Sequence, residues 1–288
     1  MKFLDNLDFL VVTGSRLYGY NNEDSDRDEI GFCITPLEFF LGRKNFKQKT
    51  PTQAELDLGN DRLIYSSSKF ITLLLKSDTR CLEMLFANNE NILAKNEIAQ
   101  MLIDNRDLFV SKQIYHKFKG YANGEWRKVK GTQLIVKKRS KTEEEIVADI
   151  RKTFSLSKIH MDEVVYHLFA EHKKEEVKIT RKLGAKRKAD IAKYGYSVKN
   201  AAHVIRLLNE GIEILETGKL KFPLSLDLVS TLVDIRNGKV SLQYVEEMYE
   251  LLLMRLEVAN SDSKLPEKIS EKEVDALQFA MHKKALKL

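Results

Sequence analysis

The stretch VVTGSRLYGYNNEDSDRDEIGFCIT, from Val11 to Thr35, contains five acidic residues: four lie with two serines and two glycines between two apolar runs, and the fifth, Glu29, opens the second run. The runs Phe9–Thr13 and Glu29–Thr35 are typical of short buried strands. A loop that only joins two strands needs glycine to turn and a few polar residues, but no acids at alternate positions entering the second strand. The stretch therefore predicts two strands and a loop that carries chemistry.

The composition indicates a folded chain in which helix predominates. The 288 residues are 43% hydrophobic, enough for a substantial core, and four prolines and thirteen glycines disfavour an all-β sandwich. The net charge of +6 is compatible with a nucleic-acid partner without requiring one. Cys33 and Cys81 have no CxxC or Cys/His spacing, so we expect structural thiols in a reducing compartment and no zinc site.

The sequence contains no segment typical of a membrane span. The N-terminal apolar run is interrupted by Asp5 and Asp8 and lacks a small-residue cleavage site. No later segment approaches about 18 uninterrupted apolar residues. We expect a cytoplasmic protein with no membrane partner.

The order of patterns along the chain predicts an α+β fold. The segment DRLIYS, residues 61–66, offers a third short strand, and apolar residues recur at helical spacing from Ser67 onward. Further helical patterns cover residues 96–131, Thr142–Lys182, 198–220, 241–259 and 271–285. We expect a small mixed sheet in an α/β domain at residues 1–112, and a larger, mainly helical domain at residues 113–288.

Two carboxylates and a glycine turn form the strongest candidate site. Asp26 and Asp28 are two residues apart, so their side chains project to one face if the segment is extended. Such a pair can hold a divalent cation that keeps phosphate oxygens in its shell. Gly14 and Ser15 follow the first strand where a helix could begin, so they could hold a triphosphate. The simpler alternative is a solvated turn, but the combined order of motifs favours a site.

These motifs resemble those of the polymerase-β nucleotidyltransferase superfamily. The resemblance implies that residues 1–112 form a palm-like nucleotidyltransferase domain, and that the helical domain completes the cleft for nucleotide and acceptor. GSRLYG supplies its GS motif and SDRD its metal-binding DxD pair, and the chain is most similar to bacterial and phage predicted nucleotidyltransferases. The likeness extends to LIYSSSKFITLLLKSDTRCLEMLF and to YGYSVKNAAHVIRLLNEGIEILETG. The superfamily has a third acid on a neighbouring strand, for which Asp61 fits best, with Asp57 and Glu55 as rivals. Asp61 could instead be a charge at a strand edge.

Several cations are candidates for binding the nucleotide. Lys199, His203 and Arg206 fall on one face of a helix that follows Tyr196, and the family pattern also has Lys, His and Arg there. From the residues alone, His203 could be an interior histidine and the two cations a solvated edge. Arg16 and Lys69 complete the predicted nucleotide-binding set, although either could be a surface cation. The basic tracts 125–141 and 178–196 fit binding along a phosphate backbone or a solvated face.

The resemblance implies a magnesium- or manganese-dependent enzyme that transfers a nucleoside monophosphate from an NTP, with ATP as the expected donor. Asp26, Asp28 and Asp61 would hold the metal ions and carry catalysis. The acceptor is open among RNA, proteins and small molecules, with RNA as the first candidate. The alternative is a non-catalytic nucleic-acid-binding or interaction protein that keeps the nucleotidyltransferase scaffold.

Overall fold

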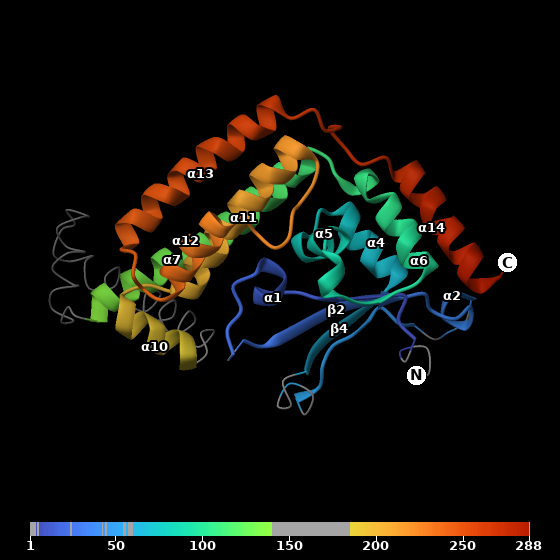
Figure 1. The fold of residues 1–288 in the computed structure, drawn as a ribbon, viewed down its shortest axis with the longest axis horizontal. Helices are drawn as coiled ribbons and strands as arrows, with labels where there is room; N and C mark the ends of the chain where they lie inside the picture. The colour runs from blue at the N-terminus through green and yellow to red at the C-terminus, as the bar shows by residue number, and fades with distance from the viewer. Residues whose placement is uncertain are drawn as a thin grey trace, which may run out of the picture. The chain divides into compact units, whose positions relative to one another are not determined.

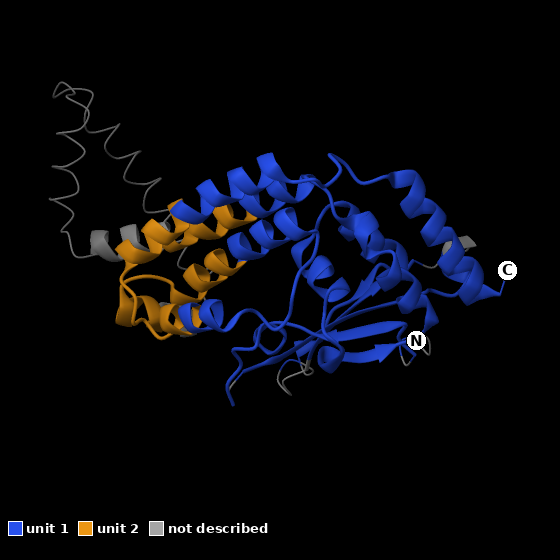
Figure 2. Ribbon diagram, turned by 45° about the horizontal axis from the view of Figure 1, so that its top comes forward, with its two compact units in different colours: residues 1–120, 207–231, 251–288 blue, residues 121–206, 232–250 orange. Residues whose placement is uncertain are grey.

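The structure is a computed structural model, and it describes residues 4, 6–23, 25–41, 43, 45–53, 56, 60–139 and 185–287. The described chain forms two compact units, coloured in Figure 2. Unit 1 contains residues 1–120, 207–231 and 251–288, and unit 2 contains residues 121–206 and 232–250. The predicted helix from Thr142 to Lys182 lies outside the described residues. The predicted boundary between residues 112 and 113 stays a prediction.

Unit 1 is built on a five-stranded mixed sheet in the order β3-β4-β2-β1-β5. β2 and β4 pair in parallel, whereas the other neighbours are antiparallel. The strands are β1 (Phe9–Val12), β2 (Arg27–Cys33), β3 (Gln48–Lys49), β4 (Asn60–Ser66) and β5 (Ile92–Lys95). The small mixed sheet and the predominance of helix confirm the α+β prediction, while β3 and β5 had no clear sequence signal.

Strand register fixes which side chains share a face of the sheet. In the parallel pair, Asp28 lies opposite Asp61 and Phe32 opposite Tyr65. Side chains alternate along each strand, so these four residues belong to one face. On this face Phe32 stacks on Phe70 with ring centroids 5.0 Å apart, and both side chains are fully buried. The aromatic core therefore covers one end of the face, and the carboxylates lie at the other.

Helices of unit 1 cover this face (Figure 1). They include α4 (Ser67–Leu75), α5 (Thr79–Leu85), α6 (Glu97–Asp104) and α14 (Glu271–Leu286). The side chain of Ser66 caps α4 by accepting a hydrogen bond from the Lys69 amide. The helical pattern after Ser67 is divided, because Ser77 adopts a φ of 52° and Asp78 caps a new helix, α5.

Three of the remaining helices follow the sequence patterns with shifted bounds: α7 (Gln113–Arg139), α11 (Val198–Thr217) and α13 (Leu242–Asp262). Three others lie outside the predicted helical segments: α2 (Glu38–Leu41), α10 (Ala185–Tyr194) and α12 (Leu226–Arg236). α11 ends immediately before Gly218, whose φ of 71° suits a helix C-terminus. None of the described helices combines the length and apolarity needed to span a membrane.

Both cysteines are buried and free. Burial raises the pKa of Cys33 to about 12, and the negative charge of Asp8 adds to the shift. Burial also raises the pKa of Cys81 well above its usual value. Thiols that stay protonated are poor nucleophiles and poor metal ligands, in agreement with the structural role predicted for them.

Candidate active site

The turn after β1 brings Gly14 directly against Asp28. The Thr13 amide donates to the Asp28 carbonyl at 2.8 Å, which holds the turn beside β2. Gly14 has φ 68° and ψ −149°, a conformation almost confined to glycine. A Cβ at Gly14 would lie 2.6 Å from Oδ2 of Asp28, closer than real Cβ contacts. The GS and DxD motifs are therefore adjacent in space, and only glycine leaves room for the carboxylate.

A short helix begins at the predicted position. α1 (Ser15–Tyr18) follows Gly14 and ends at Gly19, which has φ 85°. The Tyr18 hydroxyl donates to Oε2 of the fully buried Glu83 at 2.7 Å, and the Tyr18 carbonyl accepts from the Leu224 amide at 3.2 Å. These contacts fasten α1, and with it the GS turn, to the rest of unit 1.

Replacing Tyr18 with phenylalanine tests this anchor. The variant removes one donor from a buried carboxylate, so we expect the free energy of unfolding to fall by about 1–3 kcal/mol. Urea denaturation followed by circular dichroism measures the change. Tyr20→Phe, which alters the aromatic neighbour of Tyr18 and leaves the Glu83 contact in place, is the matched control. Equal stability of the Tyr18 variant and the wild type would contradict the anchoring role.

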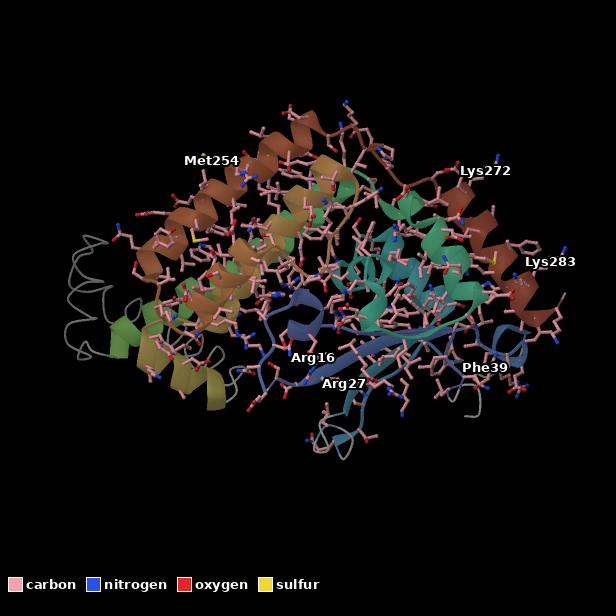
Figure 3. The ribbon with its side chains drawn as sticks, viewed as in Figure 1. Arg16, Arg27, Phe39, Met254, Lys272 and Lys283 are labelled. Atoms are coloured by element: carbon pink, nitrogen blue, oxygen red, sulfur yellow. The ribbon has the colours of Figure 1, made fainter. Side chains whose placement is uncertain are left out.

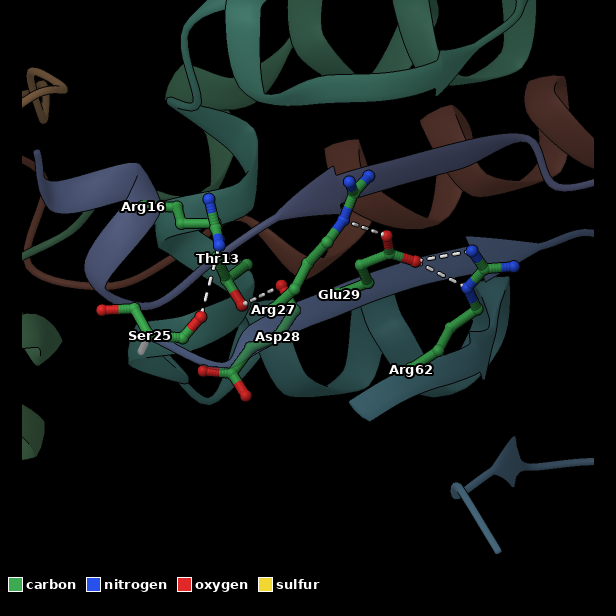
Figure 4. Close-up of polar contacts among 7 residues, drawn as sticks. All are labelled: Thr13, Arg16, Ser25, Arg27, Asp28, Glu29 and Arg62. Atoms are coloured by element: carbon green, nitrogen blue, oxygen red, sulfur yellow. Dashed lines mark hydrogen bonds and ion pairs between the residues drawn. The ribbon is translucent and has the colours of Figure 1, made fainter. Parts of the chain in front are cut away.

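The charged side chains at the start of β2 point to opposite sides of the strand. Asp28 points to one side of the strand, and Arg27 and Glu29 point to the other (Figure 4). Asp61 lies opposite Asp28 on β4 and therefore shares its face. Asp26 is exposed and immediately precedes β2. The sheet thus places Asp28 and Asp61 on one face of neighbouring strands, which is called the acidic face below.

The acidic face has the right donors for a hard cation. Asp26 and Asp61 are exposed and Asp28 is half-buried, so carboxylate oxygens are accessible to a Mg²⁺ or Mn²⁺ ion and its waters. Among the described residues, no three His, Cys, Asp or Glu side chains are close enough together to hold a metal ion. The metal-binding roles of the three aspartates stay predictions. The rivals Asp57 and Glu55 lie outside the described residues.

Arg16 links the GS helix to the loop before β2. Its Nη2 donates to the Ser25 carbonyl at 3.2 Å, and Figure 3 shows Arg16 and Arg27 near the same end of β2. The Arg16 Nε is buried and has no hydrogen-bond partner within the described residues. A buried donor of this kind fits an anionic ligand beside the GS turn. Lys69 is half-buried in the first turn of α4, where its amide binds the Ser66 side chain.

The four distal candidates lie in unit 2, on or beside α11. Tyr196 is buried, and its hydroxyl donates to the Val240 carbonyl at 2.8 Å. Arg206 is only 3% exposed, and its Nη2 lies 3.0 Å from Nδ1 of His203. The His203 ring meets the Tyr121 ring edge-on at 5.4 Å, whereas Lys199 is exposed. The structure joins His203 and Arg206 as the helical spacing predicted; the nucleotide-binding roles of all four stay predictions.

Sequence reasoning missed two buried acids. Glu29 binds Arg27 at 2.8 Å on the same strand and Arg62 at 2.6 Å on β4. In unit 2, Glu125 accepts from Asn200 at 2.8 Å. The spacing of Arg27 and Glu29 could have predicted their contact, because alternate residues of a strand share a face. The partners Arg62 and Asn200 depend on strand register and helix packing, which the local pattern does not reveal. The basic tracts are described only in part.

A mixed sheet with a GS turn held against an aspartate of β2, and a second aspartate opposite on β4, is consistent with a nucleotidyltransferase of the polymerase-β type. The chain matches RlaP, the RNA repair pathway DNA polymerase beta family, over residues 6–283. It therefore belongs to this family, which supports a function of the nucleotidyltransferase type. No match to the chain was found among curated proteins or among solved structures.

Proposed function

We propose that this protein transfers a nucleoside monophosphate from an NTP, with ATP as the expected donor, to a hydroxyl group of RNA and releases pyrophosphate. The observation that carries the proposal is the approach of Gly14 to Asp28, with Asp61 opposite on the parallel strand. This arrangement supports a phosphate-binding turn beside carboxylates that would bind a metal ion.

The turn would bind the triphosphate. The backbone at Gly14 and Ser15 would hold phosphate oxygens, and Arg16 would supply a positive charge through its buried Nε. Lys69 is the second cation proposed for the phosphates, and it lies in the first turn of α4, which begins at the end of β4 away from Asp61. The cations and the amides together would neutralise the charge of the phosphates and orient the α-phosphorus.

The aspartates would bind the metal ions and the acceptor. Asp26, Asp28 and Asp61 would hold magnesium or manganese, which supplies charge neutralisation at the transferring phosphoryl group when bound. Asp61 would also help to activate the acceptor hydroxyl by drawing its proton. The oxygen of that hydroxyl forms a bond to the α-phosphorus as the bond to the pyrophosphate oxygen breaks, so catalysis rests on positioning and electrostatics.

RNA is proposed as the acceptor for two reasons. The family is described as an RNA repair pathway family, and the chain carries a net charge of +6. A basic protein attracts a polyanion such as RNA more strongly than it attracts a neutral small molecule. Proteins and small molecules remain the acceptors against which RNA has to be tested.

Labelled nucleotides test the reaction directly. The protein is incubated with magnesium, one α-labelled NTP at a time and total cell extract, and the label is then followed into RNA, protein and small molecules. We expect label in RNA that ribonuclease releases, accompanied by pyrophosphate, and loss of the signal with a metal chelator.

The outcomes separate the candidate functions. Label that enters protein or small molecules while RNA stays unlabelled would overturn RNA as the acceptor. Absence of incorporation into every fraction, combined with salt-dependent RNA binding, would favour a non-catalytic RNA-binding protein on the same scaffold.

A further inference from the structure

A pair of arginines on the sheet is held by one buried carboxylate. Arg27 donates through Nε to Oε1 of Glu29 at 2.8 Å. Arg62 approaches Oε2 of Glu29 through Nε at 2.7 Å and through Nη2 at 2.6 Å. The Glu29 side chain is 9% exposed, whereas the Arg27 and Arg62 side chains are 52% and 50% exposed. Figure 4 shows Glu29 between the two guanidinium groups.

The cluster carries more positive than negative charge. Two guanidinium groups share one carboxylate, and within the described residues neither arginine has another hydrogen-bond or ion-pair partner. Both Nη atoms of Arg27 and Nη1 of Arg62 thus keep donors for a ligand. Because the Glu29 contacts fix both guanidinium groups, these donors are oriented before a ligand arrives, which lowers the entropic cost of binding.

The arginines lie beside the candidate active site but on the opposite face of the strands. Arg27 stands between Asp26 and Asp28, and Arg62 directly follows Asp61. Because successive side chains of a strand point to opposite faces, the acidic face and the arginine pair occupy the same ends of β2 and β4. A polyanion that reaches the acidic face by running around these ends of β2 and β4 passes close to both arginines.

We propose that Arg27 and Arg62 bind backbone phosphates of the acceptor RNA strand next to the nucleotide that reacts. The proposal rests on RNA as the acceptor in the proposed function. Guanidinium groups bind phosphate through paired N–H donors, and their half-exposed position suits a ligand that lies along a surface. The NTP is assigned to the other face, beside Gly14 and Asp28, so its affinity does not depend on this pair.

RNA binding of a triple variant tests the proposal. The triple variant carries Arg27→Gln, Glu29→Gln and Arg62→Gln. It removes both arginines together with the Glu29 charge, so no buried charge is left unpaired. The probe is a fluorescent single-stranded RNA of about 20 nucleotides, longer than the roughly 4–16 that common single-strand sites cover. We expect its Kd to rise at least about tenfold. The slope of log K against log salt should become shallower by about 1.4, since each lost phosphate contact contributes about 0.7.

Two control variants separate binding from structure and from total charge. Glu29→Gln keeps both arginines and loses only the carboxylate that orients them, so its RNA affinity should fall by much less than that of the triple variant. Lys272→Gln, Lys283→Gln removes more net charge than the triple variant, from exposed positions on α14 away from Arg27 (Figure 3), and should leave the affinity nearly unchanged.

Three outcomes would overturn the proposal: unchanged RNA affinity in the triple variant, an equal loss in Glu29→Gln, or a loss confined to NTP affinity. The binding assay contains neither NTP nor metal, so it is independent of turnover. If the arginines bind RNA and no nucleotide is transferred, only the proposed function fails. If nucleotide transfer to RNA persists and the triple variant binds normally, only this inference fails.

Discussion

Transfer of labelled nucleotide is expected to fall at least about 10³-fold when Asp26 and Asp28 are both replaced by asparagine. Asparagine keeps the size of each side chain but removes two of the negative charges proposed to bind the metal ions, so the affinity for a divalent cation falls. Losing several kcal/mol of charge stabilisation in the transition state corresponds to a loss of this size. Initial rates at saturating magnesium and NTP, compared with the wild type, measure the effect.

A neighbouring acid provides the matched control for this loss. Glu23 is exposed in the same loop, so Glu23→Gln removes a nearby charge without touching the proposed ligands, and transfer should stay within about twofold of the wild type. Circular dichroism and thermal unfolding establish that the double variant is folded. A folded double variant that retains transfer would refute the roles proposed for Asp26 and Asp28.

Local sequence patterns predicted the parts of the fold that local physics determines. Short apolar runs predicted β1, β2 and β4, and the Ser66 region predicted the start of α4. The GS motif predicted a helix after Gly14, and α1 begins there. Each of these features depends on residues close together in the chain, so a single sequence is enough to predict them.

The pairing of the strands brings together residues whose proximity the sequence alone could not reveal. Asp61 lies opposite Asp28 only because β4 pairs in parallel with β2, and the same register brings Arg62 to Glu29. The sequence also did not reveal which side chains are buried. The spacing of Arg206 indicated its helix face, but not that the residue is only 3% exposed. The short strand β5 became recognisable only through its pairing with β1.

Replacing Gly14 with alanine is expected to damage stability and activity together. The φ of 68° and ψ of −149° would strain an alanine, so the free energy of unfolding should fall by about 1–3 kcal/mol. The new Cβ would lie 2.6 Å from Oδ2 of Asp28, and the carboxylate must move away from it. A misplacement of about 1 Å at a reacting centre can cost about 10²-fold in rate. Chemical denaturation and the labelled-nucleotide assay measure the two effects.

Gly19→Ala separates the effect on Asp28 from general strain. Gly19 has φ 85°, and a Cβ there would lie 2.8 Å from the Cβ of Pro223, so this variant has a similar backbone cost without touching the carboxylate. We expect comparable destabilisation in the two variants but a much smaller loss of transfer for Gly19→Ala. Equal losses of transfer would mean that strain in α1 alone limits activity. The larger loss in Gly14→Ala would show that the space which glycine leaves beside Asp28 is itself required for the reaction.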